Sequence, residues 1–148
     1  LGLSPNLILT SRAINNSMSK FVAEQTIKLL IQHDKSIKGS NILILGVTFK
    51  ENCPDVRNTK VLDIGDELQK YGINVSYSDP WVSEEDWRYL GVQPVSFDRI
   101  PRLAYDAVIV AVNHKEFRCQ DDHFASFCKG SNLIIDIKGS MISPSWRL

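Results

Sequence analysis

Four basic side chains follow three separate apolar segments of this chain, after the point where each segment ends. They are Lys50, Arg57, His114 and Lys138. If the apolar segments are parallel strands, their carboxyl ends meet at one edge of a sheet, where open α/β sheets bind ligands. Each charge-assisted hydrogen bond from such a cation to a phosphate is worth about 1.5–3 kcal/mol. The spacing therefore predicts an anion site at the rim of a sheet.

The elements that must position these side chains are short apolar strands separated by helical or turn-rich segments. Strands are predicted at Asn41–Leu45, Asn74–Ser78, Ala107–Val112 and Leu133–Ile137, with a short extended piece at Val92–Val95. Helical or turn-rich segments are predicted from Val61 to about Gly72 and at Ser83–Leu90, Asp98–Leu103 and Asp121–Cys128, with a loop or short terminal helix at Ser140–Leu148. This alternation predicts an α/β fold with a doubly wound parallel sheet.

A long amphipathic helix is predicted before the α/β unit, from Ser11 to about Lys35. Ser11 is its expected N-cap, and Gly39 is the expected stop after a basic last turn. Its apolar stripe consists of Ile14, Met18, Phe21, Val22, Leu29 and Leu30. The boundary between helix and α/β unit is placed at Ser36–Ser40, which divides the chain into residues 1–38 and 39–148. The stripe needs a partner surface, either the core of the same chain or a second copy.

The turn after the first predicted strand lacks the glycines of a dinucleotide-binding fold. A Rossmann unit carries G-x-G-x-x-G at this point, whereas this chain has only Gly46 followed by a long loop. No P-loop follows any predicted strand either. The fold is therefore expected to be Rossmann-like without the glycine fingerprint, so that side-chain cations and not the backbone would bind a phosphate.

The composition sets the broad class. Lys plus Arg and Asp plus Glu both number 17 in 148 residues, so no net charge draws the chain to nucleic acid or to an anionic membrane. No apolar run has the roughly 18 residues that span a bilayer, and no secretory leader is evident. Cys53, Cys119 and Cys128 match no metal-binding pattern. Reduced thiols in a cytoplasmic protein, without a metal site, are the expectation.

The segment GVTFKENCPDVRNT at residues 46–59 resembles the signature of the UDP-glucose/GDP-mannose dehydrogenase family, G-x-x-[FY]-K-x-x-x-x-D-x-R. Its form is most similar to the branch that acts on UDP-N-acetylhexosamines for surface polysaccharides. Further segments that fit the family in order and spacing are Arg12–Asn15, Asp79-Pro80, His114–Phe117 and Asp136–Gly139. Asn16 departs from the family, because an acidic residue is common there.

The resemblance implies roles for individual residues. Phe49 and Lys50 would contact the nucleotide sugar, and Lys138 occupies the position of a family basic residue near it. Arg57 would face the cofactor, NAD, with Asp55 orienting Arg57 or its loop. The family places NAD mainly on a separate N-terminal domain, together with a catalytic thiol that is not Cys53.

For the whole protein, the resemblance implies an NAD-dependent UDP-sugar 6-dehydrogenase that makes capsule precursors in the cytoplasm, as a homodimer built on the central helix. Residues 1–38 would end that helix, and residues 39–148 would form the C-terminal UDP-sugar-binding domain. This part would carry no catalytic residue and be inactive alone. We expect the reading frame to extend upstream of Leu1 and to encode G-x-G-x-x-G and a cysteine motif.

The residues also allow less specific interpretations. Lys50 can be a solvated loop lysine, and Arg57 can pair with Asp55 or Asp63 in a surface salt bridge. His114 has the chemistry of a general base, although a structural histidine at the strand end is favoured over it. Asp79 resembles a ribose-binding acid, but a turn role with Pro80 is favoured.

The tryptophans are expected to pack against the domain or an interface. The alternative function is a stand-alone, non-catalytic α/β module that binds a nucleotide or a protein, since fold alone does not separate the two.

Overall fold

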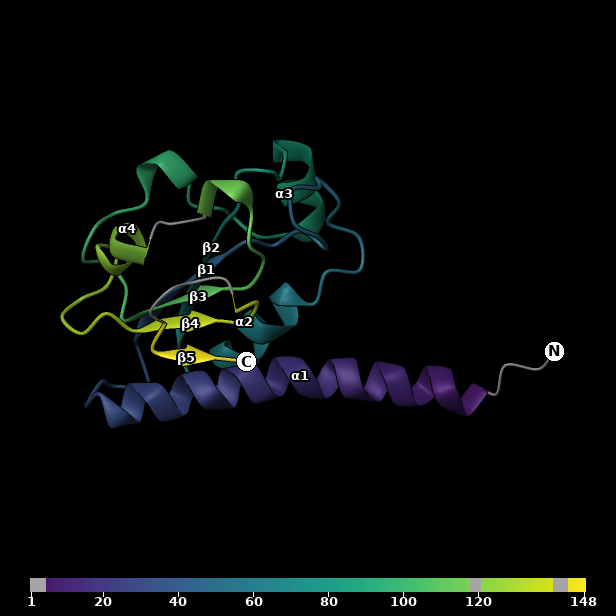
Figure 1. The fold of residues 1–148 in the computed structure, drawn as a ribbon, viewed down its shortest axis with the longest axis horizontal. Helices are drawn as coiled ribbons and strands as arrows, with labels where there is room; N and C mark the ends of the chain where they lie inside the picture. The colour runs from purple at the N-terminus through teal and green to yellow at the C-terminus, as the bar shows by residue number, and fades with distance from the viewer. Residues whose placement is uncertain (1–4, 118–120, 140–143) are drawn as a thin grey trace.

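The computed structural model describes residues 5–117, 121–139 and 144–148, with side chains described from residue 17 onward except that of residue 121. Its centre is a five-stranded, all-parallel sheet in the order β2-β1-β3-β4-β5 (Figure 1). The strands are β1 (Asn41–Leu45), β2 (Asn74–Ser78), β3 (Ala107–Val110), β4 (Ile134–Asp136) and β5 (Trp146–Arg147). The predicted parallel α/β fold is confirmed.

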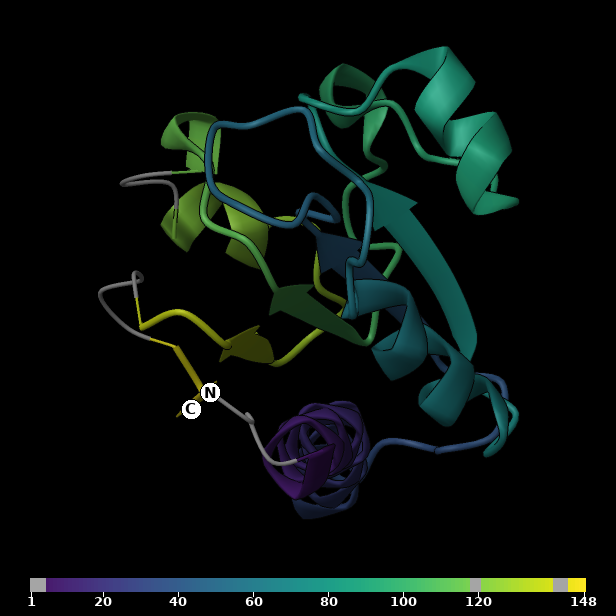
Figure 2. The ribbon, with the colours of Figure 1, turned by 90° about the vertical axis from the view of Figure 1, so that its right-hand side faces the viewer.

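Helices cover both faces of this sheet, as the end-on view shows (Figure 2). They are α1 (Pro5–Gln32), α2 (Val61–Gln69), α3 (Glu84–Leu90), α4 (Asp121–Ala125) and the short 3-10 turns η1 (Phe97–Arg99) and η2 (Lys115–Phe117). Helices α1 and α2 pack together on one face. On the other face lie α4 and the two 3-10 turns. The sheet is therefore doubly wound, as predicted.

The strands form because their side chains are buried on both faces. Ile42 and Ile44 of β1 face α1 and α2, where they join Leu30 and Leu68 in one core. Leu43 and Leu45 alternate to the opposite face and pack in a second core that includes the phenylalanines of α4 and η2. A parallel strand covered on both sides reads as a continuous apolar run, which is the pattern that predicted it.

Strand β1 lies between β2 and β3, so the chain leaves β1 in one direction along the sheet and later returns on its other side. Leu45, the last residue of β1, pairs with Ser78 of β2 and with Val110 of β3. The loops that follow these three residues therefore emerge side by side at the carboxyl rim. This is the switch point at which open α/β sheets bind ligands.

Helix α1 begins earlier than predicted. It starts at Pro5, so Ser11 lies inside it and the predicted N-cap is wrong. Proline suits this position because its fixed φ is helical and the first turn needs no N–H donor. Val22 and Leu30 are buried as predicted, but Met18 and Phe21 stay about 40% exposed. The side chain of Ile14 lies outside the described residues.

The C-terminal segment differs from the prediction of a loop or short helix. Trp146–Arg147 forms β5, which extends the sheet beyond β4 in parallel register. Without β5, strand β4 would be the edge of the sheet, with backbone groups that need partners. Leu148 supplies one of them, because it donates its N–H to the carbonyl of Asp136. Trp146 also meets Phe21 of α1, with ring centroids 6.1 Å apart. Pairing with β4, and not a local sequence pattern, thus makes this segment extended.

The structure also bears on the expectations for membrane-spanning helices, thiols and tryptophans. Within the described ranges, no helix is long and apolar enough to cross a bilayer. Cys53 and Cys128 are free thiols, and Cys119 lies outside the described residues. Trp87 is buried in the core beside α2, as expected for a packing tryptophan.

Candidate functional site

The turn after β1 uses its backbone donors inside the protein. The four N–H groups of residues 46–49 all have acceptors: the first lies 2.9 Å from the carbonyl oxygen of Ser78. The next two lie 2.6 and 3.2 Å from Oδ2 of Asp79, and the fourth lies 2.7 Å from the carbonyl oxygen of Asp55. These are the donors that a dinucleotide-binding turn would aim at a pyrophosphate. The chain therefore has no backbone cradle for NAD at this position.

Gly46 is required by the close approach of β1 to the segment after β3. Its φ is +81°, in the left-handed region, and a Cβ there would collide with the backbone carbonyl of Val112. This contact brings the loop after β1 and the segment after β3 together at the rim.

A cavity of about 200 Å³ opens at the rim, between α1, the start of α2 and the carboxyl ends of β1, β3 and β4. Phe49 and Lys138, from segments about 90 residues apart, line it together. Val22 and Val112 give it an apolar wall. A site that encloses a nucleotide-sized ligand has roughly 300–1,000 Å³, so this surface supplies only part of one.

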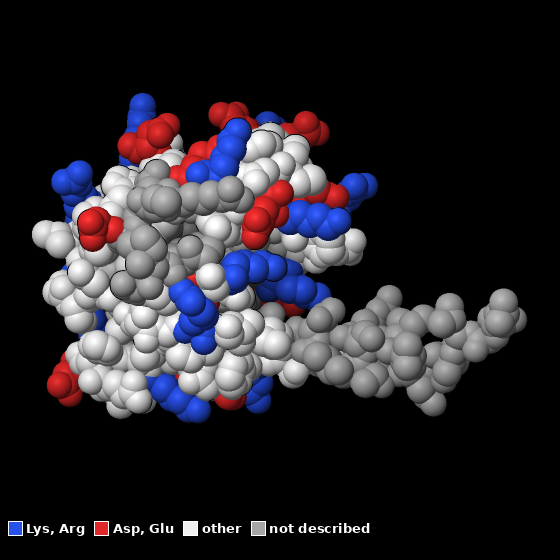
Figure 3. All heavy atoms as spheres, in the orientation of Figure 1, with Lys and Arg blue, Asp and Glu red and all other residues white. Residues whose placement is uncertain are grey.

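Lys60 also lines this cavity, although the sequence did not single it out. It precedes α2, and its Nζ lies 3.2 Å from Oδ2 of Asp63. The sequence signal that could have identified Lys60 is its position at the start of a helix that follows the first strand. Figure 3 shows basic side chains gathered where the α/β unit meets α1.

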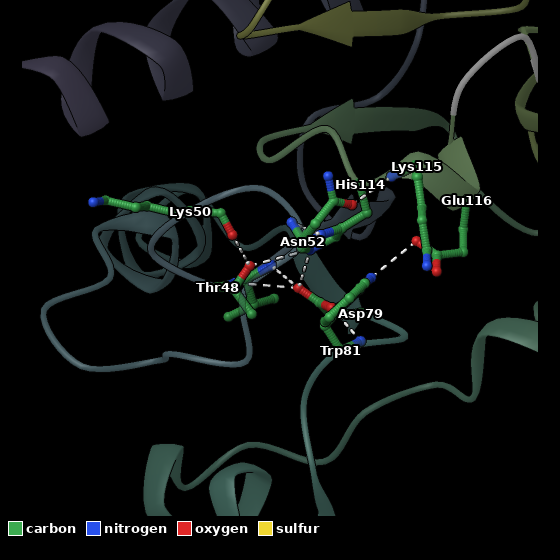
Figure 4. A network of polar contacts seen from close by, with 9 residues as sticks. Thr48, Lys50, Asn52, Asp79, Trp81, His114, Lys115 and Glu116 are labelled. Carbon is green, nitrogen blue, oxygen red and sulfur yellow. Dashed lines mark hydrogen bonds and ion pairs between the residues drawn. The ribbon is translucent and has the colours of Figure 1, made fainter.

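Lys50 lies at the rim but not in the cavity lining. Its Nζ is 5.8 Å from the ring centroid of Phe49, which is 52% exposed. In the close view, the lysine side chain extends away from the buried residues beneath it (Figure 4). Lys50 and Phe49 thus present one cation and one aromatic face outward from the loop after β1.

Asp55 and Arg57 form a fork of three hydrogen bonds. Nε of Arg57 is 3.0 Å from Oδ1 of Asp55, Nη2 is 3.0 Å from Oδ2, and the backbone N–H of Arg57 also donates to Oδ1. The side-chain hydrogen bond from Arg57 lowers the pKa of Asp55 to about 2. Both the orienting role of Asp55 and a surface salt bridge predict this pairing, and the Arg57 side chain is 79% exposed.

His114 does not belong to the anion site, so its inclusion among the rim cations was wrong. The residue is fully buried under the loop after β1, with Nε2 3.0 Å from Oδ2 of Asp79 and 3.1 Å from Oγ1 of Thr48. Trp81 stacks on its ring at a centroid distance of 5.9 Å. The structural interpretation of His114 is confirmed.

Asp79 forms the predicted turn and also binds a second segment that sequence reasoning missed. Its Oδ1 accepts from the N–H of Trp81 at 2.7 Å, which closes the turn through Pro80. Its Oδ2 accepts the three donors described above. Burial raises the pKa of Asp79, but the hydrogen bonds from His114, Val47 and Trp81 outweigh it, so the pKa lies below its ordinary value.

The fold and the position of the rim cavity are those of a doubly wound α/β domain with a switch-point site. Residues 43–143 match the UDP binding domain of the UDP-glucose/GDP-mannose dehydrogenase family, and the chain belongs to that family. The resemblance carried by Phe49–Thr59 is confirmed at this level.

Individual relatives narrow the comparison. The chain is 43% identical over 140 residues to the UDP-N-acetyl-D-glucosamine 6-dehydrogenase of Salmonella typhi, covering 93% of this chain and 32% of the relative. It is 35% identical to Protein CapL of Staphylococcus aureus, over all of this chain and 36% of CapL. The chain thus spans about a third of the length of these curated relatives.

Solved structures of related dehydrogenases share the fold. An NDP-N-acetyl-D-galactosaminuronic acid dehydrogenase from Methanosarcina mazei Go1 matches with a TM-score of 0.79 and 26% identity, over 96% of this chain and 29% of that one. The UDP-N-acetyl-mannosamine dehydrogenase Cap5O from Staphylococcus aureus matches with a TM-score of 0.68 and 28% identity, over 96% and 32%.

Proposed function

We propose that this chain is the C-terminal, UDP-sugar-binding part of an NAD-dependent dehydrogenase that oxidises C6 of a UDP-N-acetylhexosamine to a carboxylate. The product would be a precursor of a surface polysaccharide such as a capsule. The observation that carries the proposal is the convergence of Phe49 and Lys138 on one rim cavity, beside a turn whose amides are already bonded. The printed activities of the relatives supply the substrate class.

Three residues would contact the UDP-sugar. Lys138, at the cavity wall, and Lys50, above the loop, would bind the diphosphate through their ammonium groups. Phe49 would pack against the sugar or the base with its exposed ring. Lys60 is a further candidate because it lines the same wall. Side-chain cations take this role since residues 46–49 have no N–H to offer.

NAD would be bound mainly by a separate N-terminal domain of the same chain. The closed turn after β1 does not fit a pyrophosphate, so the cofactor does not occupy the Rossmann position of this unit. Arg57 would face the cofactor from across a cleft, because its fork is oriented by Asp55 and exposed. The catalytic thiol would come from that other part, and Cys53 would not serve as the nucleophile.

Residues 1–38 would complete a central helical region and residues 39–148 the sugar-nucleotide domain. Among the described side chains of helix α1, Met18 and Phe21 are exposed apolar residues next to its buried side, and Ile31 is a third, near its end. In the proposal Met18 and Phe21 contact the rest of the enzyme or the second subunit of a homodimer, in the cytoplasm.

Isothermal titration of the chain with UDP-N-acetyl-D-glucosamine tests the binding role. We expect Lys138→Ala and Lys50→Ala each to weaken binding about tenfold or more, the loss of one charge-assisted hydrogen bond. Lys129→Ala is the matched control, because Lys129 lies near Asp106 at the opposite edge of the sheet. Identical affinities in wild type and both rim variants would refute the assigned residues.

A further inference from the structure

Beneath the loop after β1 lies a buried group of polar side chains that the proposed function does not use. His114 is at its centre, and both ring nitrogens are engaged (Figure 4). Nδ1 accepts a hydrogen bond from the backbone N–H of Asn52 at 2.9 Å. A backbone N–H can only donate, so Nδ1 carries no proton. The ring is therefore neutral, with its hydrogen on Nε2 facing Oδ2 of Asp79.

The segment bonded to this histidine is the one that carries Phe49 and Lys50. Asn52 has a φ of 53°, in the left-handed region, and its Oδ1 accepts the N–H of Lys115 at 2.8 Å. On the other side, Oγ1 of Thr48 lies 3.1 Å from Nε2 of His114, and the same hydroxyl donates to the carbonyl of Lys50 at 3.0 Å. Both ends of the short segment from Thr48 to Asn52 are thus fixed to residues 114–115, beyond the end of β3.

We propose that His114 is a positioning residue for UDP-sugar binding: its neutral ring holds Phe49 and Lys50 in place by accepting the N–H of Asn52 and donating to Asp79. This rests on the proposed function. A protonated ring would aim an Nδ1–H at the N–H of Asn52, and two donors cannot form a hydrogen bond. The loop would then lose the contact that maintains its left-handed turn.

Several charged groups surround His114. Asp79 faces it from the end of β2, and its pKa lies below the ordinary value. Glu116 of η2 accepts a hydrogen bond from Trp81, whose ring stacks on His114. Burial raises the pKa of Glu116, but the hydrogen bond from Trp81 brings this pKa below its ordinary value. Lys115 stacks its ammonium over Trp81 at 5.2 Å. Histidine is the side chain whose charge ordinarily changes between about pH 5 and pH 8.

The test uses two variants of this buried position. Asn in place of His114 keeps an acceptor near the position of Nδ1 and takes up no proton, whereas Ala removes the acceptor. We expect His114→Ala to weaken binding of UDP-N-acetyl-D-glucosamine about tenfold, the loss of roughly one buried hydrogen bond. His114→Asn should stay within about threefold of wild type. His123→Asn, on α4, is the matched control.

The pH profile separates positioning from a purely structural role. Each phosphate of this ligand has one ester and one anhydride link and takes up no proton near neutral pH, so a change in affinity belongs to the protein. Because protonation of the ring would break the hydrogen bond from the N–H of Asn52, wild type and the His123→Asn control should lose affinity on acidification, and His114→Asn should not. Equal slopes in wild type and His114→Asn would overturn the proposal, even if His114→Ala does not fold.

Amide hydrogen exchange of the ligand-free chain distinguishes this failure from failure of the proposed function. We expect the N–H of Asn52 to exchange about tenfold faster at low pH relative to the N–H groups of β1, after correction for intrinsic rates, in wild type but not in His114→Asn. If the UDP-sugar does not bind the wild type, the proposed function fails. Faster exchange would then still support the loop-holding role, and its absence would refute it.

Discussion

Lysines and aspartates lie at both the amino and the carboxyl ends of the strands, but their exposure differs between the two ends. At the amino edge, Lys35 is covered: its Nζ donates to the carbonyl of Lys129 at 2.7 Å, lies 3.9 Å from Asp106 and has a side chain only 12% exposed. Asp106 in turn accepts the N–H of Asn41. At the carboxyl rim, Lys50 extends outward over Phe49. Charges that join elements are covered, and those we assign to a ligand are open.

The carboxylates differ between the edges in the opposite sense. Asp79 at the rim is buried and accepts four donors, so it fixes the floor of the site, whereas Asp106 remains partly exposed between two lysines. The rim therefore combines a buried, hydrogen-bonded floor with exposed cations. In the proposed site, the residues assigned to the ligand therefore depend on polar groups that would not touch it.

The largest expected effect comes from Gly46→Ala at the rim. A left-handed φ for alanine and a Cβ against the carbonyl of Val112 together cost about 4 kcal/mol of folding free energy. Urea unfolding measures this loss. Gly130→Ala is the control, because its φ is also positive but its Cβ would meet no atom within 4 Å. Equal losses would show that strain alone, and not the closeness of the two rim segments, determines the cost.

Asp79→Asn should destabilise the fold by about 2–3 kcal/mol at neutral pH, because an amide group replaces a charged acceptor that binds four donors. The pKa of Asp79 is lowered in the folded state. Its contribution is therefore complete above the ordinary value of about 4 and is lost as pH falls through the lowered pKa. Unfolding curves of variant and wild type should converge in acid. A constant difference down to pH 2 would contradict the ionised carboxylate.

At the amino edge, Lys35→Met should cost about 1 kcal/mol, the value of one hydrogen bond, and leave UDP-sugar affinity unchanged. Thermal unfolding and titration of the same preparation check both expectations. A variant that unfolds normally but binds the UDP-sugar more weakly would contradict the assignment of Lys35 to the structural lysines.

The smallest effect on this domain is expected from Arg57→Ala. Without the guanidinium, the pKa of Asp55 should rise from about 2 toward its ordinary value near 4 and stay somewhat below it, because the backbone N–H of residue 57 still donates to Oδ1; NMR titration of the carboxyl would show this. Since the pair is exposed, solvent and salt screen it and stability should change little. In the whole enzyme, the variant should raise the KM for NAD and not that for the UDP-sugar. The opposite split would place Arg57 at the substrate.

Much of the scaffold was predictable because buried parallel strands leave continuous apolar runs. Asn41–Leu45 and Asn74–Ser78 were predicted to the residue, and the end of Ala107–Val112 was placed two residues late. Strand β5 was not predictable, since two residues have no periodicity and only the open edge of β4 makes them extended. The start of α1 was missed because Ser11 looked like a cap.

The site was predictable in its location but not in its polar floor. The order of strands places Phe49 and Lys138 at one rim, and this convergence is what the structure has. The burial of His114 depends on Asp79, 35 residues earlier in the chain, and no local pattern reports such a pairing. Lys60 was overlooked because a lysine before a helix is usually a solvated one.

The occupied amides after β1 have a consequence for protein engineering. A designer who wished to turn this domain into a dinucleotide binder could not succeed by inserting glycines at residues 47–51, since the carboxylate of Asp79 would still hold the amides that a pyrophosphate needs. Asp79 would have to be replaced first, and with it the anchor of His114. The residue that follows β2 thus excludes a dinucleotide from this domain, as the turn after β1 does.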